Sequence, residues 1–180
     1  MNEEKRSNCV LGFVPGRRTI GIAVHDGAHL QHYGVISLKR YKADNDKMAI
    51  VIGVLSDLVS RFRLKAIVTL KLCPKRSTGF NIQLISTLNQ IAVDYFCSLH
   101  SFSLREVKEL LGKESRIQSQ RQLAKTLSDT NSELSRFLPT DPSRLITDKE
   151  KYYQPLFLAT GLAYSYLKSL ENEQQSLQNP

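Results

Sequence analysis

The sequence lacks the features that mark membrane, secreted and multidomain proteins. Its N-terminus has no apolar signal core, and no apolar run reaches the length of a membrane-spanning helix. We therefore expect a cytoplasmic protein with no membrane partner. Because neither a Ser- or Gly-rich linker nor a repeat interrupts the chain, we expect one domain over residues 9–170, between flexible ends at 1–8 and 171–180.

Cysteine is scarce, and the familiar motifs of nucleophilic catalysis are missing. Cys9, Cys73 and Cys97 are odd in number and have no CxxC spacing, which argues against a disulfide framework and against a zinc site. Neither a GxSxG elbow nor a Walker loop occurs. The cysteines are expected to be buried, reduced core residues.

Acidic residues are few relative to basic ones. Lys and Arg number 25 against 17 Asp and Glu, so the formal net charge is +8. This excess favours a polyanionic partner such as nucleic acid, although a basic surface that serves solubility would give the same total.

The densest group of histidines is His25, His29 and His32, around an expected hairpin turn. Three imidazoles could hold Zn²⁺ if the turn brought them together. We instead expect polar turn and strand residues on a solvated face, because His32 lies further along the next strand.

Hydrophobic spacing and turn residues predict an alternation of strands and helices. Short Pro-Gly and Asp-Gly turns join the first three strands, which are therefore expected to be antiparallel. A helix with Asp46 as its N-cap follows, then a short apolar strand suited to a parallel position beside the first. The last helix should start near Pro155, since proline is tolerated in a first helical turn. The predicted strands cover 9–14, 19–25, 30–38, 66–70 and 99–103, and the other predicted helices cover 46–62, 81–96, 105–111 and 115–128.

This order predicts an α/β fold with a mixed five-stranded sheet and helices on both faces. Three antiparallel N-terminal strands come first, and parallel strands follow.

Three segments match motifs of a known family in order and spacing. They are Leu11-Gly12-Phe13-Val14-Pro15-Gly16, then Arg105-Glu106-Val107-Lys108 with Gly112 and Gln118-Ser119-Gln120, and finally Leu138-Pro139 before a helix with small residues. Together they resemble the RuvC-type Holliday-junction resolvases of the ribonuclease-H-like superfamily over about residues 9–167. The string 19–24 is equally similar to the YqgF branch, but the long segment after the fourth strand favours the RuvC branch.

The resemblance also implies which positions would carry the chemistry. Resolvases of this kind cut phosphodiesters with two divalent metal ions, held by carboxylates of the first strand, the fourth strand and the last helix. Here those positions fall on Val14, Lys71, Tyr152 and Pro155, so the resemblance implies a pseudonuclease without catalytic residues, metal or cofactor. The alternative is an active nuclease in which Asp148 and Glu150 serve as relocated metal ligands.

Basic residues surround the same positions. Arg17 and Arg18 lie in the first turn, and Lys71, Lys75 and Arg76 lie on or after the fourth strand, so they could share one end of the sheet. A surface of this kind would bind phosphates with steep salt dependence and little sequence preference. Solvated surface charges are the alternative. The residues expected to extend the surface are Lys108, Lys113, Arg116 and Arg121.

The helix predicted over 81–96 matches the element through which the resolvases dimerise, which favours a homodimer; a well-covered core helix has the same pattern.

The sequence leaves three hypotheses for the function of the protein. The first is an inactive RuvC-like domain that binds nucleic acid, branched or structured, without cutting it. The second is a structural or protein-interaction module on the same fold, and the third is the nuclease with relocated carboxylates.

Overall fold

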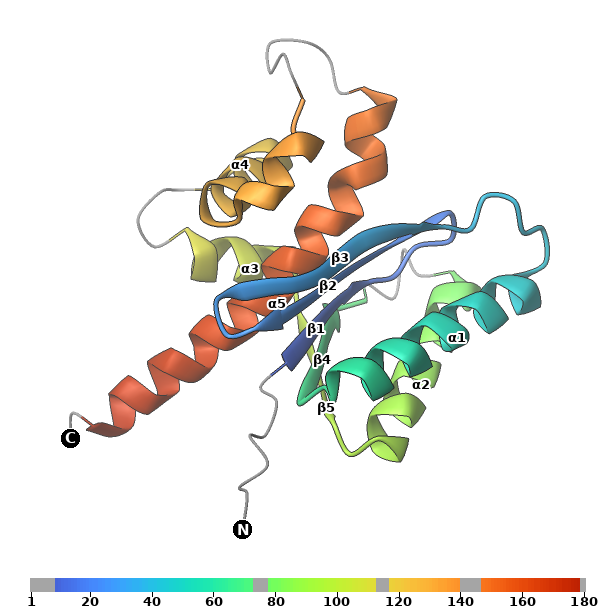
Figure 1. The fold of residues 1–180 in the computed structure, drawn as a ribbon, viewed down its shortest axis with the longest axis horizontal. Helices are drawn as coiled ribbons and strands as arrows, with labels where there is room; N and C mark the ends of the chain where they lie inside the picture. The colour runs from blue at the N-terminus through green and yellow to red at the C-terminus, as the bar shows by residue number, and fades with distance from the viewer. Residues whose placement is uncertain (1–8, 73–77, 113–116, 140–146, 179–180) are drawn as a thin grey trace.

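A single sheet organises the protein in the computed structural model, which describes residues 9–72, 78–112, 117–139 and 147–178 (Figure 1). The strand order is β3-β2-β1-β4-β5. Strands β1, β2 and β3 are antiparallel, whereas β4 and β5 run parallel to β1, which confirms the predicted mixed α/β sheet. The strands are β1 (Cys9–Val14), β2 (Thr19–Asp26), β3 (His29–Ser37), β4 (Ala66–Leu70) and β5 (Ser98–Phe102).

Helices cover both faces of this sheet. The first face carries α1 (Asp44–Phe62) and α2 (Gly79–Asp94). The long helix α5 (Asp148–Gln178) crosses the second face, and further elements pack on it from outside (Figure 1). Those elements are α3 (Leu104–Leu111), α4 (Gln120–Thr130) and the 3₁₀ helix η2 (Ser132–Phe137). Among the described helices, none is both long and apolar enough to cross a membrane.

Strand β1 supplies both hydrophobic cores because its side chains alternate between the faces. Leu11 and Phe13 are fully buried in the core under α1 and α2, whereas Val10 and Val14 lie in the core under α5. The strand is therefore apolar along its whole length.

Helix α5 rests directly on the backbone of β1 and β2. A Cβ atom at Gly12 would collide with the backbone of Ala159, and one at Gly21 with the backbone of Pro155. These two glycines permit the close approach that fixes α5 over the end of β1.

Two predicted helix starts are wrong. Helix α1 has Ala43 as its N-cap, without a side-chain capping bond, and Asp46 lies inside the first turn. Helix α5 begins at Asp148, so Pro155 is inside it. Thr147 and Glu150 form a capping box that fixes this start: the Glu150 N–H donates to Thr147 Oγ1, and the Thr147 N–H donates to Glu150 Oε2.

Helix α5 continues past residue 170, where the domain was expected to end, and its backbone is helical to Gln178. The flexibility of the segment from residue 171 stays a prediction. Other predicted bounds shift less: α2 starts at Gly79, where Thr78 accepts a bond from the Asn81 N–H, and α4 starts after Ser119, which forms a capping box with Gln122.

Candidate nucleic-acid interface

The candidate interface lies where the parallel strands β1, β4 and β5 finish. Phe13 pairs with Thr69, and β5 runs beside β4 in the same direction, so the three strands end at one edge of the sheet. The segment after β3 reaches this edge as well, because the Leu38 N–H donates to the Arg18 carbonyl at 2.8 Å. Ends of parallel strands are common ligand sites in open α/β sheets.

The positions expected to hold metal ligands carry other side chains. Val14 is buried under α5. Pro155 of that helix lies against Gly21, the residue that pairs with Val14 across the sheet. Lys71 is exposed, and its backbone N–H donates to the Phe102 carbonyl at 2.9 Å. Valine and proline side chains offer no oxygen, and an ammonium repels a cation, so these residues do not fit Mg²⁺. Across the described ranges, no three His, Cys, Asp or Glu side chains are grouped so as to hold a metal ion.

A basic cleft of about 490 Å³ opens beside this edge. Lys47 lies at its inner side: the lysine side chain is only 8% exposed, and Nζ donates to Asp44 Oδ1 at 2.8 Å. Arg17, Arg18 and Lys39, which are exposed, line the same cleft as this buried lysine. The lining residues are Arg17, Arg18, Leu38, Lys39, Tyr41 and Lys47.

Asp44 offsets only part of this charge. The hydrogen bond from Lys47, followed by the charge of Arg17 at 3.5 Å, holds the pKa of Asp44 below its ordinary value. Because the carboxylate stays ionised and engages Lys47, the cleft keeps an excess of positive charge near Arg18 and Lys39. Such an excess favours an anionic ligand.

Lys71 extends the positive charge toward β5. Hydrogen bonds with Ser103, followed by the charge of Lys71, lower the pKa of Glu106 in the first turn of α3. The structure thus brings Arg17, Arg18 and Lys71 to one end of the sheet, as the strand order suggests.

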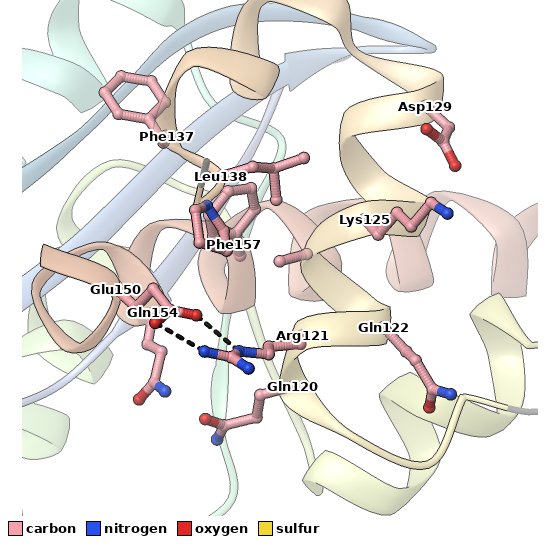
Figure 2. Close-up of a pocket in the computed structure, with 12 residues that line it drawn as sticks. Gln120, Arg121, Gln122, Lys125, Asp129, Phe137, Leu138, Glu150, Gln154 and Phe157 are labelled. Carbon is pink, nitrogen blue, oxygen red and sulfur yellow. Dashed lines mark hydrogen bonds and ion pairs between the residues drawn. The ribbon is translucent and has the colours of Figure 1, made fainter. Parts of the chain in front are cut away.

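Two other predicted binding residues have internal partners. Lys108 Nζ donates to the Gln118 carbonyl at 2.6 Å, which ties α3 to the segment before α4. Arg121 donates to both Glu150 oxygens, from Nε at 2.7 Å and from Nη2 at 2.9 Å (Figure 2). Four further predicted residues, Lys75, Arg76, Lys113 and Arg116, lie outside the described ranges.

Glu150 has a structural role at the start of α5. The hydrogen bonds from Arg121 above all, with those from Thr147, lower the pKa of Glu150 to about 2. Its two oxygens are thus already engaged by an arginine and a backbone N–H. The Asp148 carboxylate is fully exposed and lies 3.6 Å from Lys151.

Comparison with solved structures identifies the fold. Thermus thermophilus RuvC in complex with a Holliday junction substrate has a TM-score of 0.68 at 14% identity, over 92% of this chain and 96% of that one. The yeast mitochondrial Holliday junction resolvase Ydc2 has a TM-score of 0.63 at 15% identity, covering 95% and 83%. Fowlpox virus resolvase with Holliday junction DNA has a TM-score of 0.55 at 11% identity, covering 90% and 98%. The chain has the RNase-H-like fold of the RuvC-type resolvases. No protein-family model and no curated protein matches the sequence.

Sequence reasoning missed part of the basic cleft on this RuvC-like fold. Lys39, Tyr41 and Lys47 line it beside the predicted Arg17 and Arg18. A signal for them was present, because Lys39-Arg40-Tyr41-Lys42 is a basic run with an aromatic inside it, directly after the third strand. Aromatic and basic residues in alternation are typical of surfaces that bind nucleic acid.

A second cavity, of about 400 Å³, lies between α4 and α5 (Figure 2). Phe157, Leu138 and Phe137 give it apolar walls, and the Arg121–Glu150 pair borders it. Mostly apolar walls with a few polar groups are common to small-ligand pockets. It is separate from the basic cleft, since the two share no lining residue.

The histidine cluster does not converge, and its expected solvation is wrong for one member. His25 is fully buried, with its ring 6.0 Å from Tyr164 of α5, whereas His32 lies 5.8 Å from Phe62 of α1, on the opposite face of the sheet. His29 is exposed at the start of β3.

Proposed function

We propose that this protein is a RuvC-like domain that binds branched DNA through the basic end of its sheet and does not cleave it. One observation carries the proposal: the sheet end combines the side chains of Val14 and Lys71 with the cations of Arg17 and Arg18. A cluster of this kind attracts phosphate oxygens, whereas hydrolysis by two metal ions requires several carboxylates there.

The solved structures with a similar fold support DNA as the anionic ligand. The T. thermophilus and fowlpox virus structures contain Holliday junctions, and their folds extend over at least 90% of this chain. The absence of a fitting ligand set at Val14, Lys71, Tyr152 and Pro155 supports binding without hydrolysis.

Charge reversal tests the proposal. In the Arg17→Glu/Arg18→Glu double variant, affinity for a four-way DNA junction should fall about tenfold or more at low salt. The slope of log K against log salt should become shallower by about one unit for each lost phosphate contact. Lys65→Glu is the matched control, because Lys65 is an exposed lysine that precedes β4 at the other end of the sheet. Equal affinities for the double variant and the wild type would count against the proposal.

We further propose that α2 pairs two copies of the chain. Leu84, Leu88 and Ile91 of this helix face the core, whereas Ile82 and Val93 are 56% and 62% exposed. Phe96, just beyond the helix, is 97% exposed. This apolar surface also fits the second hypothesis, a protein-interaction module, which predicts a different protein as the partner.

A further inference from the structure

A continuous row of aromatic rings runs from β3 to the first turns of α5. Tyr33 lies edge-on to Phe137 with 6.1 Å between ring centroids, and Phe137 lies 4.6 Å from Tyr153. Tyr153 in turn meets Tyr152 at 5.0 Å and 85°. The rings come from three elements, β3, η2 and α5, and all four are half-buried.

Cations lie at both ends of this row. At one end, Arg136 donates from Nη2 to the Tyr33 hydroxyl at 2.8 Å, and its guanidinium lies 4.8 Å from the Phe137 centroid. At the other end, Lys39 Nζ lies 6.0 Å from the Tyr152 centroid. The first contact holds Tyr33 and Phe137 in place. The second is at the limit of a cation–π interaction, so the lysine can leave the ring at little cost.

Tyr152 differs from the other three rings in its packing. Tyr33, Phe137 and Tyr153 pack against the core under α5, which accounts for their positions. Within the part of the chain that the structure describes, Tyr152 packs against neither core. Its ring lies against Tyr153 and within 6.0 Å of the ammonium of Lys39.

Lys39 links Tyr152 to the basic cleft. The lysine lines the cleft together with Arg17 and Arg18, while its ammonium reaches the Tyr152 ring. A strand of nucleic acid with a phosphate in the cleft would therefore have a neighbouring base within reach of this ring. A base inside a duplex is already stacked, so an aromatic ring can accept only an unpaired or displaced one.

We propose that Tyr152 stacks against an unpaired base at a DNA branch point while Lys39 and Arg18 hold the adjoining phosphate. The inference rests on the proposed function and deepens it, because it names the substrate feature that is recognised. Stacking of this kind tolerates any base, since every base has a π-face.

The test uses branched DNA with an unpaired 2-aminopurine at its branch point, and a fully paired duplex beside it. Binding of the wild type should quench the 2-aminopurine emission. Tyr152→Leu keeps an apolar side chain but removes the ring, so affinity for the branched DNA should fall about 5- to 150-fold and the quenching should disappear. Tyr152→Phe should behave like the wild type, and affinity for the duplex should not change in either variant.

Tyr164→Leu is the matched control. Tyr164 is also a half-buried tyrosine of α5 with a lysine near its ring, Lys168 at 5.4 Å, but it lies about 18 Å further along the helix. This variant should bind like the wild type. Salt-sensitive binding by the wild type without quenching, or equal affinities for wild type and Tyr152→Leu, would overturn the stacking role and leave the proposed function standing. No binding of the wild type to either DNA would overturn both.

Discussion

His25 is a polar residue in an apolar place. It pairs with Val10 in the sheet and faces α5, where its ring lies 6.0 Å from that of Tyr164. Neither ring nitrogen has a hydrogen-bond partner within the described ranges. Burial therefore lowers the pKa of His25 to about 4, although the nearby backbone of Gly27, which lies outside normal hydrogen-bond geometry, partly offsets this effect.

This shift predicts an acid-sensitive fold. The folded protein keeps His25 neutral, while the unfolded chain takes up a proton below its ordinary pKa of 6.5. The stabilisation is complete above pH 6.5 and is lost as the pH falls toward 4, by up to about 3 kcal/mol at about 1.4 kcal/mol per pKa unit. Urea unfolding between pH 7.5 and 4.5 measures it.

His25→Leu should remove most of this pH dependence; a smaller part should remain, because burial above all also lowers the pKa of His32. Because it replaces two unpartnered nitrogens with an apolar side chain, the variant should be at least as stable as the wild type at pH 7.5. Glu150 affects the stability in a separate pH range, because its lowered pKa contributes stability that is lost only below pH 4.5. An unchanged slope in His25→Leu between pH 6.5 and 4.5 would assign the acid sensitivity to another group.

At the scale of the element, the contact of α5 with the sheet depends on two glycines. Gly12→Ala should push α5 away from β1, because the new methyl group would meet the carbonyl of Ala159. Overpacking of a core usually costs about 1–3 kcal/mol, and a clash with backbone belongs at or above the upper end. Chemical denaturation of the purified variant measures the loss.

Gly53→Ala is the control for this prediction. Gly53 lies in α1, where an added Cβ meets nothing within 4 Å, so alanine should stabilise that helix by about 0.5–1 kcal/mol. Similar effects of the two substitutions would show that the close packing of α5 on β1 contributes little.

The sequence predicts those elements whose signals are local. The apolar strands and their turns predict the antiparallel unit, and the mostly apolar run 66–70 predicts a strand between two neighbours. The predicted start of α5 was wrong because it relied on Pro155 as a first-turn residue. The capping-box spacing of Thr147 and Glu150, which marks the true start, was also present in the sequence.

In the candidate site too, some residues are predictable from the sequence and others depend on how distant elements pack. Arg17 and Lys71 follow strand ends, so the strand order alone brings them to one edge of the sheet. The pairing of Arg121 with Glu150 joins residues 29 positions apart and depends on how α4 packs on α5. The aromatic row at Tyr152 likewise combines three elements, which spacing along the chain does not reveal.

At the scale of the whole molecule, the exposed end of α2 predicts a dimer. Phe96 has a left-handed backbone with a φ of 55°, which is unfavourable for a phenylalanine, and its side chain is 97% exposed. Val93→Ser/Phe96→Ser should shift the molar mass in sedimentation from that of a dimer to that of a 20.4 kDa monomer. Lys125→Ser, on the exposed side of α4, should leave the mass unchanged. A wild-type protein that is monomeric at high concentration would rule out α2 as a self-association surface.

The charge of the whole molecule is consistent with the proposed function. A net charge of +8 favours a polyanion such as DNA, and the cations at the end of the sheet are its proposed contact site. Affinity should therefore fall steeply with salt whatever the sequence of the DNA arms.

The most direct test of the account is a combined binding and cleavage assay on a labelled four-way DNA junction, in the presence of Mg²⁺ or Mn²⁺. We expect a shifted complex whose DNA strands stay intact on a denaturing gel, at protein concentrations that saturate binding. Metal-dependent cleavage products, lost in an Asp148→Ala or Glu150→Gln variant that still binds the junction, would contradict it and support relocated catalytic carboxylates.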